Sequence, residues 1–488
     1  MTAVPLATTE GLGARVANAV MWRSGSQIIA QLLTWSATFF VIRTLRPADY
    51  GLYAMTQAVL VMFTFLNGYG FTGALVRAET LDHKHVRQVF GLLLLFNVSI
   101  ALIQIAIAPL VASYYRQPMV AQLLTVQSLI YLATPFTALP AALLSRAIDY
   151  RRQVGVNFLS AVAGAGTALG CAYGGAGVWT LVAAPLALFW TRAIGLTVVS
   201  GTLVMPSFRL KGTGATLAFG GAMMASQMLW FVQTQADVFI GGRVMDPHRL
   251  GLYTTALFLT QILTSKFVPA VNEIAFSAYA RLQDDRRMVA HGFAKSVRII
   301  MLAALPFYLG LAVTAAPFVR CILGPQWVGA IPIVRVLALA MPLVTVQILF
   351  APVVNALDGV RVTVKAAVGG AIIMPAAFLI GSHYGPLGLA WAWLAAFPLF
   401  ALYNAALALP VIGIGPAALF AAVRPALIAA GGMALSVLAA DQLLPVMADL
   451  PRLAVLVLLG VAVYAVLAWT FAREVIGEVA RLILRRRG

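Results

Sequence analysis

The sequence predicts an all-α polytopic membrane protein, and three observations carry that prediction. Of its 488 residues, 62% are hydrophobic and only 10% are charged, with a mean hydropathy of +0.94. Apolar segments of about 20 residues follow one another with short polar breaks, and each is long enough to cross the ~30 Å hydrocarbon core as a helix. A stretch near the N-terminus also returns two hundred residues later. Barrel strands would alternate in polarity instead of running solidly apolar.

Turn and charge signals between the apolar segments predict fourteen spanning helices. They cover residues 20–42, 52–75, 89–112, 119–144, 154–173, 177–199, 217–242, 251–275, 296–319, 330–354, 362–383, 386–409, 420–439 and 452–472. With the N-terminus inside, this layout puts 23 Lys and Arg residues in inner segments and 7 in outer ones. Because short cytoplasmic loops are rich in Lys and Arg, we expect both termini to face the cytoplasm.

An internal repeat organises these helices. Pairing residues 24–54 with the residues 200 positions later gives nine identities in thirty-one positions, and no gap is needed. The identical positions are Ser26, Gln27, Thr34, Phe39, Arg43, Pro47, Gly51, Leu52 and Tyr53. Six predicted helices separate the two copies, and an even number restores the same orientation, so the halves are predicted to be parallel repeats. We expect an N-terminal lobe over 1–205, a C-terminal lobe over 206–412, and two further helices with a basic cytoplasmic tail over 413–488.

Polar side chains inside the spans are the best candidates for a functional site, because they are costly in hydrocarbon and usually face a bundle interior or a water-filled path. The first helix carries five on one face, namely Ser24, Gln27, Gln31, Thr34 and Thr38. Its repeat carries Ser226, Gln227, Gln233, Thr234 and Asp237 over a similar face. The two stripes are predicted to line opposite walls of one central cavity. The alternative is that these amides and hydroxyls only hold helices together.

Charged residues near the inner half of the membrane suggest a second feature. Arg23, Arg192 and Lys266 form a predicted cationic inner vestibule, which would attract a phosphate or pyrophosphate group. Snorkelling to the inner interface is the alternative for Arg23 and Lys266. Asp237 is the candidate for ion coupling, although it could instead pair with a neighbouring helix. Glu273, seven residues after Lys266, is either its counter-charge or a loop anchor.

Other chemistries find little support in the sequence. No Gly-x-x-x-x-Gly-Lys-Ser/Thr phosphate loop is present, and the five histidines form no metal-ligand cluster. The net charge of +18 lies mainly in loops on one side, which argues for membrane topology and against nucleic acid as a partner. We therefore expect a protein that is not an enzyme, with no metal and no cofactor beyond a possible coupling proton or sodium ion.

Several runs of residues resemble a known family. These are Trp22-Arg-Ser-Gly25, the run from Arg43 to Tyr53, Gly70-Phe-Thr-Gly-Ala-Leu-Val-Arg77, Leu143 to Tyr150, and Leu323-Gly-Pro-Gln-Trp327. The sequence resembles the Wzx-type polysaccharide flippases of the multidrug/oligosaccharidyl-lipid/polysaccharide exporter superfamily. The likeness covers most of the chain and is most specific in the first eighty residues.

This resemblance implies two six-helix lobes around a central, often cationic cavity. It also implies transport of undecaprenyl-pyrophosphate-linked oligosaccharide across the bacterial inner membrane for exopolysaccharide or O-antigen synthesis, driven by an ion gradient. Arg23, Gln27 and Gln31 fall on the helix that lines the cavity in relatives. The other expected sites come from the residues themselves: Arg192, Gln227, Gln233 and Lys266 for substrate, and Asp237 and Glu273 for the ion. Membrane lipid is an expected partner, and a polysaccharide polymerase and a chain-length regulator are candidate partners. A drug/cation antiporter of the same superfamily and an integral-membrane polymerase remain alternatives.

Overall fold

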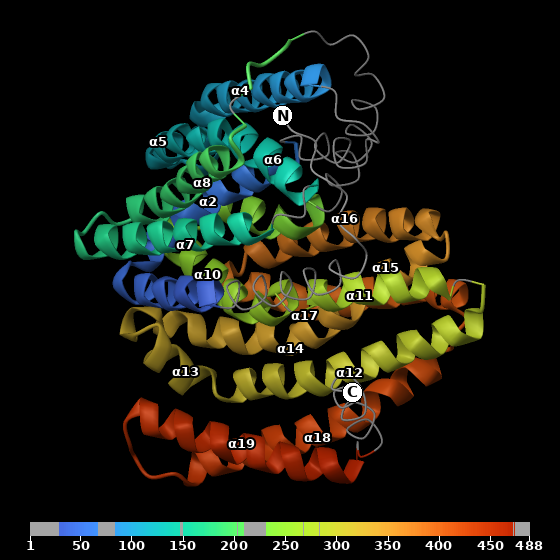
Figure 1. The fold of residues 1–488 in the computed structure, drawn as a ribbon. Helices are drawn as coiled ribbons and strands as arrows, with labels where there is room; N and C mark the ends of the chain where they lie inside the picture. Colours follow the sequence, from blue (N-terminus) through green and yellow to red (C-terminus); the bar gives the residue numbers. More distant parts are fainter. Residues whose placement is uncertain are drawn as a thin grey trace. The chain divides into compact units, whose positions relative to one another are not determined.

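A computed structural model describes residues 29–66, 83–146, 150–202, 204–208, 231–266, 268–282, 284–471 and 473. Within these ranges every regular element is a helix (Figure 1). The prediction of an all-α fold is therefore confirmed. The chain divides into two compact units, Met1–Met228 and Leu229–Gly488. The finer division into residues 1–205, 206–412 and 413–488 stays a prediction.

The first unit begins with a helical segment over residues 29–44. Its further helices are α2 (Pro47–Leu66), α4 (His83–Tyr115), α5 (Pro118–Gln127), α6 (Leu129–Arg146), α7 (Tyr150–Tyr173) and α8 (Trp179–Ser200). The second unit begins with residues 231–244. It continues with α10 (Pro247–Lys266), α11 (Val268–Arg281), α12 (Arg286–Val313), α13 (Ala315–Ile322), the 3-10 helix η1 (Pro325–Ala330), α14 (Ile331–Ile348), α15 (Phe350–Ala356), α16 (Val360–Ser382), α17 (Gly385–Ile412), α18 (Pro416–Leu443) and α19 (Asp449–Phe471).

Ten stretches of the described chain are long and apolar enough to cross a membrane. They match ten of the fourteen predicted spans, from Val86–Tyr115 to Asp449–Phe471, so the multi-pass architecture is confirmed. The other four predicted spans are the first two helices of each lobe, and each of them includes residues outside the described ranges. The count of fourteen therefore stays a prediction.

The two copies of the repeat have the same local structure. In the first copy a helix ends at residue 44 and α2 covers Pro47–Leu66, and in the second a helix ends at residue 244 and α10 covers Pro247–Lys266. Proline is favoured in the first turn of a helix because its fixed φ suits the helix and the missing N–H would have no partner there. The shared proline thus explains why α2 and α10 begin at equivalent positions.

The polar stretch near residues 278–295 predicts a long inner connection that would hold only a short interfacial helix, but such a connection is largely absent. Instead α11 continues to Arg281 and α12 begins at Arg286, which leaves four residues between them. Asp285 caps α12, because its side chain accepts a hydrogen bond from the backbone N–H of Met288 at 3.0 Å. The prediction of a short interfacial helix was wrong here, since these polar residues extend α11 and α12 instead.

Several helices are interrupted near prolines. The helix α14 ends at Ile348 and α12 ends at Val313, each four residues before a proline, Pro352 and Pro317. Proline has no backbone N–H, so the carbonyl four residues earlier loses its helical partner and the ring collides with it. The predicted helix over 330–354 consequently forms two helices, α14 and α15.

Three of the carbonyls that prolines release accept hydrogen bonds from another helix. Pro140 releases Phe136 O, which accepts from Thr197 Oγ1 of α8 at 3.1 Å. Pro352 releases Ile348 O, which accepts from Asn272 Nδ2 of α11 at 3.3 Å. Pro306 releases Leu302 O, which accepts from the Tyr464 hydroxyl of α19 at 2.5 Å. Because lipid supplies no donor, these side chains satisfy backbone groups that would otherwise be costly.

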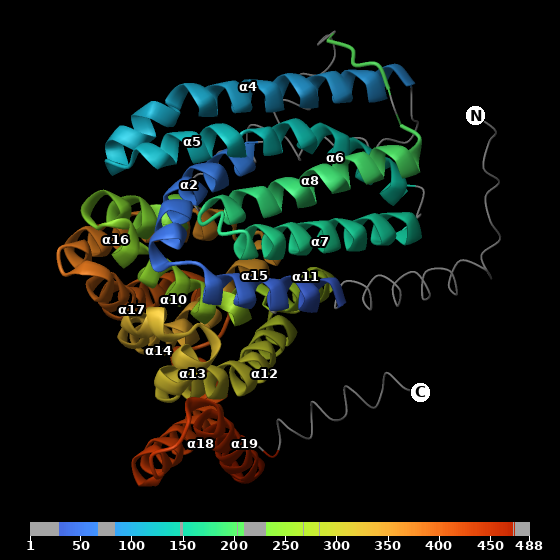
Figure 2. The same cartoon turned by 90° about the vertical axis from the view of Figure 1, so that its left-hand side faces the viewer.

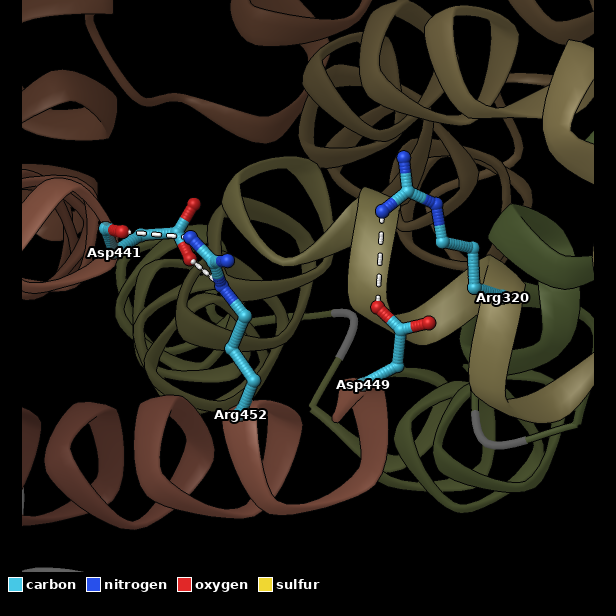
Figure 3. Close-up of polar contacts among 4 residues, drawn as sticks. All are labelled: Arg320, Asp441, Asp449 and Arg452. Carbon is cyan, nitrogen blue, oxygen red and sulfur yellow. Dashed lines mark hydrogen bonds and ion pairs between the residues drawn. The ribbon is translucent and has the colours of Figure 1, made fainter. Parts of the chain in front are cut away.

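The last two helices form a hairpin that packs on α12 (Figures 1 and 2). Met433 and Val437 of α18 and Leu456 of α19 form its buried apolar centre. At the predicted outer end, Arg452 donates from Nε to Asp441 Oδ1 and from Nη2 to Asp441 O, both at 2.7 Å (Figure 3). A looser ion pair, 3.7 Å from Arg320 Nη1 to Asp449 Oδ1, connects α13 to the start of α19 (Figure 3). The Arg452–Asp441 contact thus closes the hairpin, while the packing on α12 and the Arg320–Asp449 ion pair connect it to the rest of the second unit.

We predict that Tyr464→Phe lowers the free energy of unfolding by about 1–2 kcal/mol, because it leaves Leu302 O without a donor. The matched control is Tyr403→Phe. The Tyr403 hydroxyl also donates to a backbone carbonyl, Lys365 O at 3.3 Å, but Gly369 four residues on retains the N–H that pairs with it. Equilibrium unfolding in lipid–detergent micelles measures both.

A second variant isolates the cause. Pro306→Ala restores an N–H within reach of Leu302 O, so Tyr464→Phe should cost much less in that background. An equal cost of Tyr464→Phe with and without Pro306 would show that the released carbonyl has no part in the effect.

Candidate functional site

A polar stripe of the second repeat lies against α16 and α17. Gln233, Asp237 and Gly241 are spaced four residues apart and therefore share one face of the helix over residues 231–244. A Cβ added to Gly241 would lie 2.9 Å from Leu389 Cδ1 of α17. At the other end, a Cβ added to Gly370 of α16 would lie 2.8 Å from Gln233 Cδ. Close helix packing thus fixes the stripe on both sides of Asp237.

Asp237 is fully buried, with 0% of its surface exposed, and both of its carboxylate oxygens accept hydrogen bonds. Oδ1 accepts from the backbone N–H of Val238 at 2.8 Å. Oδ2 accepts from the hydroxyl of Tyr253 in α10 at 2.6 Å. Hydrogen bonds to an ionised oxygen are short and strong, which makes burial of the carboxylate tolerable.

The hydrogen-bonded chain continues to a third helix. The indole Nε1 of Trp393 in α17 donates to the Tyr253 hydroxyl oxygen at 2.8 Å. Trp393 itself is held by aromatic neighbours, since its ring centroid lies 5.6 Å from that of Phe378 and 5.7 Å from that of Phe397, the latter ring nearly parallel to it. We call Asp237, Tyr253 and Trp393 the buried triad. It links the helix over 231–244 to α10 and α17 in the interior of the second unit.

The first unit has no carboxylate at the equivalent position. Ala37 stands at the position of Asp237, while Tyr53 matches Tyr253. Ala37 is buried in the helix over 29–44, with 6% of its surface exposed. The hydroxyls of Thr34 and Thr38 donate hydrogen bonds within the same helix. Thr34 Oγ1 donates to Ala30 O and Thr38 Oγ1 donates to Thr34 O, both at 2.8 Å. The acidic site is therefore a feature of the second repeat alone.

The remaining predicted site residues are placed less fully. Arg23, Gln27 and Gln227 lie outside the described residues. Gln31 is half-buried in the helix over 29–44, and Arg192 is half-buried in α8, where its Nε is enclosed. Lys266 is the last residue of α10 and Glu273 lies in α11. Pairing of their side chains stays a prediction.

Sequence reasoning missed two members of the triad. Tyr253 stands out as one of the repeat's identities, but an identity shared by both copies predicts common outer-turn scaffolding and gives no sign of a role in one copy alone. Its hydroxyl donates to Asp237, a residue of the stripe that the copies do not share. Trp393 lies 140 positions further along, in a helix that the sequence shows only as uniformly apolar, so no local pattern pointed to it.

Comparison with known proteins identifies the family. The profile of a family described as "Polysaccharide biosynthesis protein" matches residues 40–332, which is more than half of the chain. The chain belongs to this family.

Several polysaccharide biosynthesis proteins are similar along much of their length. The succinoglycan biosynthesis transport protein ExoT of Rhizobium meliloti is 25% identical over 374 residues, which cover 76% of each chain. The teichuronic acid biosynthesis protein TuaB of Bacillus subtilis is 21% identical, over 55% of this chain and 56% of its own. The lipopolysaccharide biosynthesis protein WzxC of Escherichia coli is 20% identical over 59% of each chain.

Solved structures show the same fold at lower identity. The lipid II flippase MurJ, in an inward closed conformation, matches with a TM-score of 0.71 at 14% identity, over 93% of this chain and 100% of that one. An inward-facing multidrug resistance MATE family transporter matches with a TM-score of 0.58 at 14% identity, over 81% and 96%. The prediction of a Wzx-type member of this superfamily is confirmed, and so is its assignment as a transporter and not an enzyme.

The packing beside the triad makes a prediction for this polysaccharide biosynthesis protein. Gly370→Ala should lower its free energy of unfolding by about 1–3 kcal/mol, since the new methyl group would lie 2.8 Å from both Gln233 Cδ and Phe400 Cζ. The matched control is Gly431→Ala in α18, where no atom lies within 4 Å of an added Cβ. That variant should be neutral or stabilising by up to ~1 kcal/mol. Thermal unfolding of the two purified variants compares them, and equal effects would contradict the packing described.

Proposed function

We propose that this protein is a flippase that moves undecaprenyl-pyrophosphate-linked oligosaccharide from the inner to the outer leaflet of the bacterial inner membrane. The repeat unit would serve exopolysaccharide or O-antigen synthesis, and an ion gradient would drive alternating access. Both termini lie in the cytoplasm in this proposal. A polysaccharide polymerase and a chain-length regulator would take up the product on the outer side.

The relatives support this substrate class. ExoT, TuaB and WzxC are named for the biosynthesis of succinoglycan, teichuronic acid and lipopolysaccharide, and ExoT is named as a transport protein. The structural neighbour with the highest TM-score given above is named as a flippase for lipid II. Transport proteins of one family that serve chemically different glycans are expected to recognise the part that their substrates share, a polyprenyl pyrophosphate. They are expected to contact the sugars through adaptable polar side chains.

The cationic residues would bind the pyrophosphate. Arg23, Arg192 and Lys266 are the proposed vestibule, in which each Arg offers a planar fork of donors and Lys a point charge. The amides Gln27, Gln31, Gln227 and Gln233 would contact the glycan. Because Gln233 packs against Gly370 of α16, its contact with sugar belongs to a state in which α16 has moved away. The polyprenyl chain would remain in lipid.

The observation that carries the ion-coupled part of the proposal is the buried carboxylate of Asp237. Charged groups are rare in membrane-buried interiors, and a carboxylate held there by a hydroxyl and a backbone N–H is a candidate for reversible neutralisation. Asp237 joins three helices through the triad, so a change in its charge would alter their contacts. Glu273 in α11 is the second candidate for the coupling ion.

The same carboxylate favours a second candidate function, a drug/cation antiporter of this superfamily. Acidic residues attract cationic drugs, whereas Arg192 and Lys266 favour an anionic substrate. Sensitivity of a deletion strain to cationic drugs, with normal polysaccharide, would support the antiporter. Repeat units that accumulate unpolymerised on the outer leaflet would instead support a polymerase.

The substrate proposal makes a prediction for Lys266. In a deletion strain, Lys266→Glu should reduce polymer export by about tenfold or more while repeat units accumulate on the inner leaflet, because the new carboxylate repels the pyrophosphate. Lys266→Arg is the matched control and should retain export. Membrane insertion is checked by immunoblot of the membrane fraction, and normal export by Lys266→Glu would remove the vestibule from the proposal.

The coupling proposal makes a separate prediction for Asp237. In proteoliposomes that contain fluorescent lipid-linked oligosaccharide, Asp237→Asn should still exchange substrate between leaflets but should no longer respond to an imposed ion gradient. Asn keeps the shape of the side chain and cannot carry the charge. If the variant responds like the wild type to every proton and sodium gradient tested, Asp237 has no coupling role.

A further inference from the structure

The hydrogen-bond partners of Asp237 among the described residues are donors. The backbone N–H of Val238 and the Tyr253 hydroxyl both donate to the carboxylate. The Tyr253 oxygen in turn accepts from Trp393, so one of its lone pairs is also occupied. A hard cation such as sodium needs several oxygen atoms with free lone pairs directed at it. The Val238 N–H and the Tyr253 hydroxyl direct their hydrogens at the carboxylate oxygens that such an ion would have to contact.

Charged groups that face Asp237 are also scarce on the helices packed around it. The helix α17 contains no ionisable residue other than Tyr403, which is three turns from Trp393 and bonds to Lys365 O. The helix α16 carries Arg361 and Lys365 in its first two turns, and α10 carries its basic residues at its two ends. Among the described side chains, Tyr253 is thus the titratable group in contact with the carboxylate.

A proton is the cation that fits this arrangement, because it binds one oxygen and needs no shell of ligands. It would also disturb the triad. Protonation of either oxygen removes the negative charge that strengthens both accepted hydrogen bonds, and a proton on the Oδ2 lone pair that Tyr253 uses would displace its hydroxyl hydrogen. The backbone N–H of a helix cannot turn, whereas the Tyr253 hydroxyl can. Since Trp393 donates to the same hydroxyl oxygen, its contact changes as well.

We infer that Tyr253 and Trp393 make Asp237 selective for a proton over a sodium ion, and that they transmit its protonation to α10 and α17. The inference rests on the proposed function, because it names the ion that drives the flippase. Tyr253 and Trp393 are positioning residues in this mechanism. The proton comes from the aqueous phase on one side of the membrane, forms an O–H bond on the Asp237 carboxylate, and leaves to the other side when that bond breaks. The other changes in the protein are exchanges of hydrogen bonds.

The test uses full-length protein in proteoliposomes with fluorescent undecaprenyl-pyrophosphate-linked oligosaccharide. Leaflet exchange should respond to an imposed proton gradient and should not respond to a sodium gradient of equal size. In Tyr253→Phe, the pH of half-maximal exchange should rise by about 1 unit or more, because a proton then competes with one hydrogen bond fewer. The matched control is Tyr53→Phe, which removes the repeat-related hydroxyl of the copy that carries Ala37 and should leave the pH profile unchanged.

A sodium-driven wild type, or a Tyr253→Phe profile that coincides with the wild type, would overturn the inference. A second measurement separates it from the proposed function, since it needs no substrate. Tryptophan fluorescence of the purified protein is titrated with acid and with sodium chloride. An acid-dependent change should be present in the wild type and lost in both Trp393→Phe and Asp237→Asn, with no saturable response to sodium. A saturable change of fluorescence with sodium that requires Asp237 would contradict proton selectivity. This outcome is independent of whether the transported substrate is the lipid-linked oligosaccharide.

Discussion

Burial of one carboxylate is the constraint around which the second unit is arranged. A charged group inside a membrane protein is stable only when fixed donors replace the water it has lost. Asp237 obtains one donor from its own helix and one from α10, and that second donor is held by α17. The close approach of these helices, at Gly241 against Leu389 and at Gly370 against Gln233, follows from the same need for short contacts. Because these hydrogen bonds depend on the negative charge of Asp237, we expect the contacts between the three helices to change when that charge is neutralised.

The same physical rule governs the backbone. Prolines make membrane helices bend, but each one releases a carbonyl that lipid cannot satisfy. The carbonyls released by Pro140, Pro306 and Pro352 each accept from a hydroxyl or amide of another helix. Such contacts are individually weak, about 1 kcal/mol each, and can therefore exchange with other partners during a transport cycle. A flippase needs helices that can bend without leaving polar groups exposed to hydrocarbon.

Much of the fold could be predicted from the sequence, because membrane helices and duplications leave direct signals in hydropathy and spacing. The repeat led to equivalent helices with equivalent ends, and Asp237 stood out as an ionisable residue in an apolar span. The breaks within spans were harder to place, since Pro306 and Pro342 lie inside continuous helices whereas Pro352 follows a break. Tyr253 and Trp393 could not be paired with Asp237 from the sequence, because tertiary packing alone brings together residues up to 156 positions apart.

The central claim is that Asp237 takes up and releases a proton, and infrared difference spectroscopy tests it most directly. The carbonyl stretch of a protonated carboxyl group is separate from that of a carboxylate, so a change of pH reveals the carboxyls that titrate. The wild type should show a protonated-carboxyl band that disappears as the pH rises and that is absent from Asp237→Asn, in sodium and potassium buffers alike. Identical difference spectra for the wild type and Asp237→Asn would contradict the claim.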